Sequence, residues 1–130
     1  MKKIKVAVIG FGHLGKWHVE KVLAHFAFAE LVLIAENFEK NKLEAKNKYP
    51  QIKIVDDISS HLFEFDAAII VTPTSTHFEI AKFLIENNKH VFCEKPLTEN
   101  PVVSVSDGIN AVKLIEKVRE SLIKEVEVFI

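Results

Sequence analysis

The sequence predicts a single α/β domain built on a doubly wound parallel sheet. Three observations lead to this prediction: short apolar segments rich in Val, Ile and Phe recur along the chain, helical patterns separate them, and a glycine-rich turn follows the first segment. Continuous apolar strands are typical of parallel sheets with helices on both faces. The 130 residues, 48% of them hydrophobic, suffice for one core of ordinary size.

The expected strands alternate with helices along the chain. Four segments should be buried strands and one a weaker strand: Ile4–Ile9, Leu31–Ala35, Ile52–Val55 (the weaker one), Ala67–Val71 and His90–Cys93. The tail EVEVFI, residues 125–130, is a sixth candidate. Right-handed crossovers between parallel strands imply a doubly wound sheet, and if the last helix and this tail fill the sixth helix-strand position, its strand order would be 3-2-1-4-5-6.

Apolar residues at helical spacing place the helices between these strands. The helical faces are Gly15, Val19, Val22, Leu23 and Phe26 for the first helix, Ile80, Ala81, Leu84 and Ile85 for a later one, and Ala111, Leu114, Ile115, Val118 and Leu122 for the last. The charged segment Glu39–Lys48 should form a solvated helix. Thr76 and Glu79 have the spacing of a capping box, which predicts that a helix begins there.

Composition excludes several classes of protein. Seventeen basic and eighteen acidic residues leave a net charge of -1 without a basic stripe, so nucleic acid is not an expected partner. The apolar runs are too short to span a membrane. A single cysteine, Cys93, fits a reducing compartment and so a cytoplasmic protein, and its apolar neighbours indicate a buried, inert thiol. The six histidines show no metal-ligand spacing, so no metal is expected.

The strongest local signal is a GxGxxG turn between a predicted strand and a predicted helix, which is the context that dinucleotide binding requires. Gly10 would permit the tight turn, Gly12 would let a pyrophosphate approach the backbone, and Gly15 would let the helix pack closely. The alternative is a glycine-rich turn without a ligand. The candidate cofactor-binding residues of this turn are Gly10, Phe11, Gly12, His13, Leu14 and Gly15.

An acidic residue ends the second predicted strand, as this motif leads one to expect. Glu36 could accept hydrogen bonds from both ribose hydroxyls of an adenosine and would repel a 2′-phosphate, which favours NAD over NADP. Lys40 and Lys42 are close enough in sequence to leave NADP open, and a solvated strand-end glutamate is the alternative role.

Two further segments follow strands at the expected ligand-binding edge. VTPTSTH, residues 71–77, comes where the strand order should reverse, so the hydroxyls of Thr72, Thr74 and Ser75 could contact a cofactor; a loop with a helix cap is the alternative. Glu94 and Lys95 follow the fifth strand. A lysine there could donate to a reacting oxygen, although a surface salt bridge explains the pair equally well.

Together, GFGHLGKWH, the strand-end glutamate, TPTSTH and EKP resemble the glucose-fructose oxidoreductase and inositol dehydrogenase family (Gfo/Idh/MocA), including a histidine at His18. The resemblance implies a Rossmann fold, Lys95 as the catalytic lysine beside the nicotinamide, and Glu94 as a ribose contact. It also implies a cis bond before Pro96 and cofactor contacts from Thr72, Pro73, Thr74 and His77.

Residues 107–130 resemble the last helix and strand of full-length family members, especially those that act on UDP-linked amino-sugar uronates, whereas their intervening substrate domain has no counterpart here. We therefore expect residues 1–130 to be one dinucleotide-binding domain that is catalytically incomplete alone. Two alternatives stay open: an enzyme completed by a partner chain, and a nucleotide-sensing or interaction module. The apolar surface that such a domain would otherwise cover is compatible with a homodimer.

Overall fold

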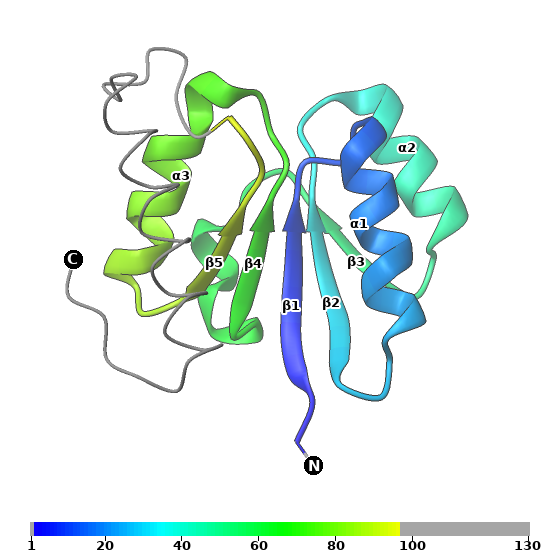
Figure 1. The fold of residues 1–130 in the computed structure, drawn as a ribbon. Coiled ribbons are helices and arrows are strands. Elements are labelled where there is room, and N and C mark those ends of the chain that lie inside the picture. The colour runs from blue at the N-terminus through cyan, green and yellow to red at the C-terminus, as the bar shows by residue number, and fades with distance from the viewer. Residues whose placement is uncertain (1, 97–130) are drawn as a thin grey trace, which may run out of the picture. The chain divides into compact units, whose positions relative to one another are not determined.

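Five parallel strands form the sheet, and all five point in the same direction (Figure 1). The computed structural model describes residues 2–96. The strand order is β3-β2-β1-β4-β5, and every neighbouring pair is parallel. The strands are β1 (Ile4–Ile9), β2 (Ala29–Ala35), β3 (Lys53–Val55), β4 (Ala67–Ile70) and β5 (His90–Cys93). The predicted doubly wound fold is thus confirmed, while the predicted sixth strand and last helix lie outside the described residues.

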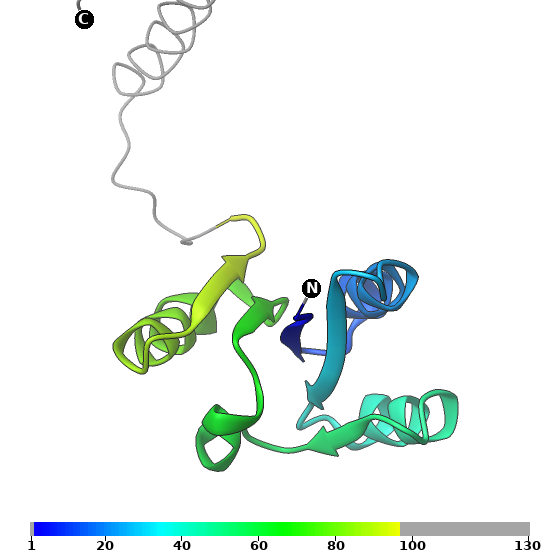
Figure 2. The same ribbon diagram turned by 90° about the horizontal axis from the view of Figure 1, so that it is seen from below.

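Helices cover both faces of the sheet. Figure 2 shows α1 and α2 on one face and α3 with the short 3-10 helix η1 on the other. Their bounds are α1 (His13–Ala24), α2 (Glu39–Lys48), η1 (Ser59–Glu64) and α3 (Thr74–Glu86). The sequence did not predict η1. Within the described part of the chain, no helix has the length and apolar character needed to cross a membrane.

The alternation of side chains along β1 explains why its sequence is continuously apolar. Val6 and Val8 pack towards α1 and α2, whereas Ala7 and Ile9 pack in the second core with residues of α3. Each face of a parallel strand must be apolar when helices cover both sides. β1 therefore lies at the centre of the fold, between β2 and β4 and with a core on each face.

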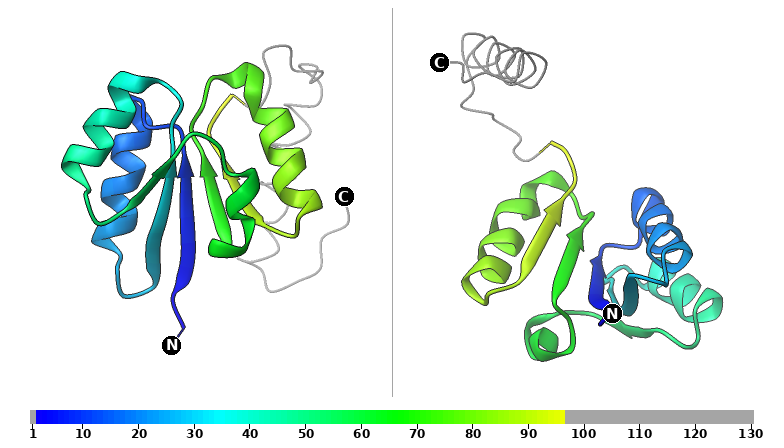
Figure 3. Two further views of the ribbon diagram at one scale, coloured as in Figure 1. Left: turned by 180° about the vertical axis from the view of Figure 1, so that it is seen from behind. Right: turned by 60° about the horizontal axis from the view of Figure 1, so that its bottom comes forward.

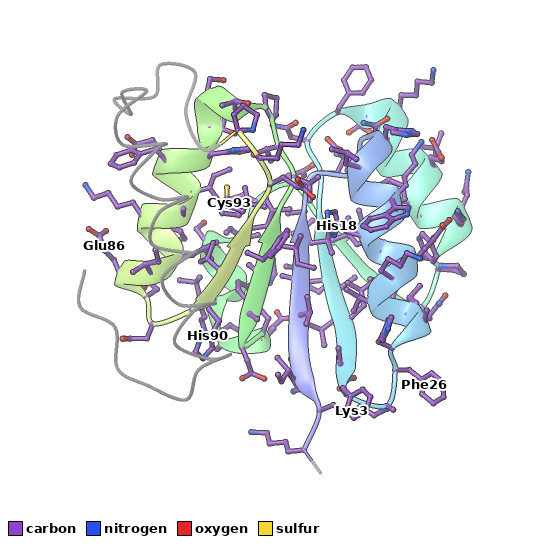
Figure 4. All side chains as sticks on the ribbon, in the orientation of Figure 1. Lys3, His18, Phe26, Glu86, His90 and Cys93 are labelled. Carbon is purple, nitrogen blue, oxygen red and sulfur yellow. The ribbon has the colours of Figure 1, made fainter. Side chains whose placement is uncertain are left out.

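The prediction for the first helix was wrong at its end. Helix α1 ends at Ala24, and Phe26 lies beyond it with 69% of its surface exposed. Figure 4 shows Phe26 at the bottom of the domain near Lys3, whose ammonium lies 5.7 Å from the ring centroid. The cause is the early start of β2, because Ala29 already pairs with Ile4 and the chain must turn before it. Ile85, predicted on the buried face of α3, is also largely exposed.

The predicted capping box is also wrong. Helix α3 begins at Thr74, two residues earlier, and Pro73 precedes it without a side-chain cap. The Thr76 hydroxyl instead donates to the carbonyl oxygen of Pro73 at 2.7 Å, which is the backward contact of a residue already inside a helix.

Candidate functional site

A cleft opens at the carboxyl ends of the strands, where the chain leaves β1 and β4 in opposite directions. The chain passes from β1 to α1 on one face and from β4 to α3 on the other (Figure 3). Such a point of divergence is where open α/β sheets bind ligands. The cleft has a volume of about 740 Å³ and is lined by residues from four segments, which follow β1, β2, β3 and β4: Ile9, Gly10 and Gly12–Leu14; Ala35–Phe38 with Asn41; Asp56–Ile58; and Val71–Pro73 with Thr76 and Ile80.

The three glycines of the turn after β1 differ in how much space their surroundings leave for a side chain. Gly10 has a φ of 99°, and a Cβ there would lie 2.7 Å from the carbonyl oxygen of Val71. A Cβ on Gly15 would lie 2.1 Å from the carbonyl oxygen of Gly10. A Cβ on Gly12, in contrast, would meet no protein atom within 4 Å. The fold itself therefore requires Gly10 and Gly15, whereas Gly12 leaves space beside the cleft.

The other candidates in this turn divide into two groups. Phe11 is fully buried, and its ring packs edge-on against Tyr49 with centroids 6.0 Å apart, so its side chain belongs to the core. His13 and Leu14 are exposed and line the cleft. What Phe11 contributes to the site is its backbone, because its N–H donates to Glu36.

The Glu36 carboxylate connects the glycine turn with the segment after β2. Its Oε2 atom accepts the backbone N–H of Phe11 at 2.8 Å, and its Oε1 atom accepts that of Phe38 at 2.8 Å. Asn41 adds a longer contact of 3.3 Å to Oε2. Glu36 is only 8% exposed, yet it lines the cleft. These bonds fix the orientation of the carboxylate and exclude the solvated strand-end role.

Only some of the candidate residues in the segment after β4 line the cleft. Thr72 and Pro73 line the cleft, but Thr74 and His77 do not. The ring nitrogens of His77 lie within hydrogen-bonding distance of two backbone carbonyls, those of Thr72 at 2.8 Å and Pro96 at 3.0 Å. His77 thus contacts the protein backbone rather than the cleft.

Five polar residues of the cleft were not among the candidates from sequence: Asn37, Asn41, Asp56, Asp57 and Thr76. The two aspartates directly follow β3, so their place after a strand was a signal that could have found them. Thr76 and Asn41 enter from helices, and no sequence pattern marks them. The cleft consequently has more acidic groups near β2 and β3 than the sequence analysis expected.

The Glu94–Pro96 segment follows β5 beyond the lining of this cleft. Glu94 Oε1 lies 2.7 Å from Nε2 of His18 on α1, and its Oε2 accepts the backbone N–H of Lys95 at 3.2 Å. The hydrogen bond from His18, followed by the bond from Lys95, holds the pKa of the Glu94 carboxyl below its usual range, although burial opposes this shift. Glu94 is therefore paired with a helix that begins at the glycine turn.

Lys95 itself is exposed, and within residues 2–96 its ammonium forms no ion pair. The alternative of a surface salt bridge between Glu94 and Lys95 is thus not found among residues 2–96, where the Glu94 carboxylate contacts His18 instead. The cis peptide bond between Lys95 and Pro96, which the resemblance implied, is confirmed.

Cys93 is a partly buried free thiol on β5, packed beside the core under α3 (Figure 4). Burial raises the pKa of its thiol, and the charge of Glu94 adds to that effect. Among residues 2–96, no three His, Cys, Asp or Glu side chains are grouped so that they could hold a metal ion.

The cleft fits a dinucleotide in three respects. The space beside Gly12 is open, the backbone N–H groups at the start of α1 have no side-chain cap, and a fixed carboxylate lies at the end of β2. A helix N-terminus with free N–H groups suits a pyrophosphate, and a carboxylate suits ribose hydroxyls.

Comparison with known proteins agrees with this geometry. The profile of the oxidoreductase family with an NAD-binding Rossmann fold (Gfo/Idh/MocA) matches residues 4–124 of the chain. The chain belongs to this family. Its Rossmann domain is therefore the dinucleotide-binding domain of that family, as the motifs had indicated.

Individual relatives point in the same direction. UDP-N-acetylglucosamine 3-dehydrogenase of Acidithiobacillus ferrooxidans is 34% identical over 100 residues, which are 75% of this chain and 30% of that protein. NAD⁺-dependent scyllo-inositol 2-dehydrogenase of Bacillus subtilis is 34% identical over 98 residues, 74% of this chain and 29% of that protein. The crystal structure of the WlbA dehydrogenase of Bordetella pertussis, in complex with NADH and UDP-GlcNAcA, is 26% identical with a TM-score of 0.68 and matches 88% of this chain and 34% of that one.

The chain thus spans about 30% of the length of the curated relatives it matches. The shared part is the dinucleotide-binding domain, so the substrates of the relatives belong to proteins that are considerably longer than this chain.

Proposed function

We propose that the cleft binds NAD(H), with the pyrophosphate beside Gly12 and the adenosine ribose at Glu36. One observation carries this proposal: the open space at Gly12 and the fixed carboxylate of Glu36 line the same cleft at the point where β1 and β4 diverge. The uncapped N-terminus of α1 supports the pyrophosphate position, because its N–H groups can donate to an anion.

Glu36 retains acceptor capacity for a ribose. A carboxylate offers about four lone-pair positions, and Phe11, Phe38 and Asn41 occupy three of them. The Oε1 atom accepts only one of these bonds, so it keeps one position for a hydroxyl donor. The backbone bonds hold that oxygen in place before any ligand arrives.

A preference for NAD over NADP follows from the charges around this ribose position. Glu36 and Asp57 line the cleft and would repel a 2′-phosphate, whereas the charge of Asp56, which also lines it, is offset by Lys42. Lys42 is one of the two lysines whose closeness in sequence left NADP open. Its ammonium lies 2.5 Å from Asp56 Oδ1 and also contacts Glu39. Its charge is therefore engaged by two carboxylates.

The nicotinamide half is expected on the opposite side of β1, towards β4 and β5, where Lys95 follows the last described strand. A bound nicotinamide dinucleotide would supply hydride transfer. Lys95 would hold or accept a proton at its Nζ atom beside a substrate hydroxyl, and Glu94 would contact the nicotinamide-side ribose. By analogy with the relatives, the substrate would be a sugar or polyol, and this chain alone would be catalytically incomplete.

Two further parts of the proposal concern the setting of the protein. The single cysteine supports a cytoplasmic location.

Exposed Trp17 and Phe92, which both lie on the α1 side of β5, support a homodimer. Sedimentation equilibrium tests the dimer, and a single monomeric species at tens of micromolar would contradict it.

The direct test of cofactor choice is a fluorescence titration with NADH and NADPH. We expect NADH to bind at least about tenfold more tightly, because a 2′-phosphate would approach the carboxylates of Glu36 and Asp57. The double variant Asp56→Asn/Asp57→Asn should lower the ratio of the NADPH and NADH dissociation constants. His90→Gln, at the start of β5 and outside the cleft lining, serves as the control. Equal or tighter NADPH binding by the unaltered chain would contradict the preference.

A further inference from the structure

Two buried histidines from different helices reach the same three-residue segment after β5. His18 on α1 is 8% exposed and contacts the side chain of Glu94, whereas His77 on α3 is 3% exposed and contacts the carbonyl oxygen of Pro96. α1 and α3 cover opposite faces of the sheet. The segment is therefore held from both faces, with Lys95 between the two contacts.

The His18 contact is short and enclosed. Its Nε2 atom lies 2.7 Å from Glu94 Oε1, and the rings of Trp17 and Phe92 lie against the imidazole with centroids 5.2 and 5.7 Å away. Figure 4 shows His18 on the side of α1 that faces the sheet. Aromatic neighbours limit the positions that the imidazole can adopt, so the position of the Glu94 carboxylate is limited as well.

The His77 contact ties the segment to the cleft. Its second ring nitrogen lies 2.8 Å from the carbonyl oxygen of Thr72, and Thr72 lines the cleft. A neutral imidazole donates from only one ring nitrogen, so in that form one of the two contacts is not a hydrogen bond. His77 thus bridges the turn after β4 and the backbone after β5.

We propose that His18 and His77 are positioning residues that clamp the Glu94–Pro96 segment and thereby direct Lys95 towards the nicotinamide half of the site. The proposal rests on the proposed function. Lys95 lacks an ion pair within the described residues, and its backbone N–H bonds to the carboxylate that His18 holds. The direction of the Lys95 side chain therefore depends on how Glu94 and Pro96 are held, rather than on a contact of the lysine ammonium.

The clamp lies away from the adenosine half, and this separation makes it testable. Glu36 follows β2 and the clamped segment follows β5, on opposite sides of β1 and β4 in the sheet. Loss of the clamp should affect a ligand that carries nicotinamide and spare one that lacks it. NADH and ADP-ribose are such a pair, because both contain the adenosine and the pyrophosphate.

The experiment measures the dissociation constants of NADH and ADP-ribose by calorimetry for the full chain, His18→Leu, His18→Gln, His77→Leu and the control His90→Gln. We expect His18→Leu and His77→Leu to weaken NADH about tenfold while ADP-ribose changes less than about twofold. His18→Gln should restore most of the NADH affinity, since its amide can donate where Nε2 does. Amide exchange at Lys95 without ligand should accelerate in His18→Leu and not in the control.

Three outcomes would count against the clamp. Equal weakening of both ligands would indicate a general structural role, and unchanged NADH affinity would indicate no role. If His18→Leu does not fold, Glu94→Gln provides the same comparison without a change in volume, and an unaltered ratio of the two affinities there would overturn the proposal. If the unaltered chain binds neither NADH nor ADP-ribose, the proposed function fails and this inference fails with it. If the unaltered chain binds both and the variants bind them equally well, only the clamp fails.

Discussion

The backbone of Gly15 passes so close to Gly10 that a Cβ on Gly15 would lie 2.1 Å from the Gly10 carbonyl oxygen. Helix α1 therefore packs directly on the turn that precedes it. This close approach places the N–H groups at the start of the helix beside the open space at Gly12. The structural and the ligand-binding roles of the turn thus belong to different glycines and can be separated by mutation.

Alanine at Gly10 should mainly affect folding stability, whereas alanine at Gly12 should mainly affect NADH binding. Gly10→Ala should lower the free energy of unfolding by about 2 kcal/mol or more, since a positive φ and a contact with Val71 both oppose a Cβ. Gly12→Ala, at the N-cap of α1, should cost no more than about 1 kcal/mol and should mainly weaken NADH binding. Urea unfolding and NADH titration check the pair, and a stable Gly10→Ala would contradict the argument.

Removal of the Glu36 side chain should destabilise the fold even without a cofactor. Glu36→Ala leaves the backbone N–H groups of Phe11 and Phe38 without their acceptor, and unsatisfied buried donors cost about 1–3 kcal/mol each. We expect a loss of about 2 kcal/mol in urea unfolding, against little change for the exposed Glu79→Ala. An equal stability of the two variants would show that the Glu36 bonds do not form.

The hydrogen bond between His18 and Glu94 should contribute stability that acid removes. Its folded pKa lies below the ordinary 4.5, mainly through the hydrogen bond from His18, so the unfolded chain binds more protons in the window below 4.5. The contribution is complete above that value and disappears as the pH falls through the folded pKa. The stability difference between the unaltered chain and Glu94→Gln should shrink across this window in urea unfolding. A constant difference would contradict the pairing.

The thiol of Cys93 should react slowly in the folded chain. Burial, and then the negative charge of Glu94, raise its pKa and lower the thiolate fraction at neutral pH. Alkylation by iodoacetamide should be at least about tenfold slower than in urea, and Glu94→Gln should react faster than the unaltered chain. Equal rates for the folded and unfolded chains would refute the prediction.

The sequence predicted most of the fold because its strongest patterns come from burial on both faces of the sheet. β1 and β5 begin and end at the predicted residues, as does α2. Phe26 and Thr76 were assigned wrongly because hydrophobic spacing and capping patterns do not reveal where the chain must turn to enter the next strand or helix.

The site was predictable only where a residue follows a strand within a recognised motif. Asp56 and Asp57 lie in the cleft by virtue of their place after β3, but no motif marks them. The partners of Glu94 and His77 were not predictable at all, since His18 is 76 residues away from Glu94 and His77 contacts backbone carbonyls. Such contacts depend on the tertiary arrangement of α1, α3 and β5.

The central claim, that a dinucleotide binds in the cleft where β1 and β4 diverge, is tested most directly by amide chemical-shift mapping of the ¹⁵N-labelled chain with NADH. We predict saturable shifts concentrated at Gly10–Leu14, Glu36–Phe38 and Thr72, with little change at Phe26 or Phe63, which are exposed outside the lining of the cleft. Saturable shifts centred elsewhere, or none at millimolar NADH, would contradict the claim.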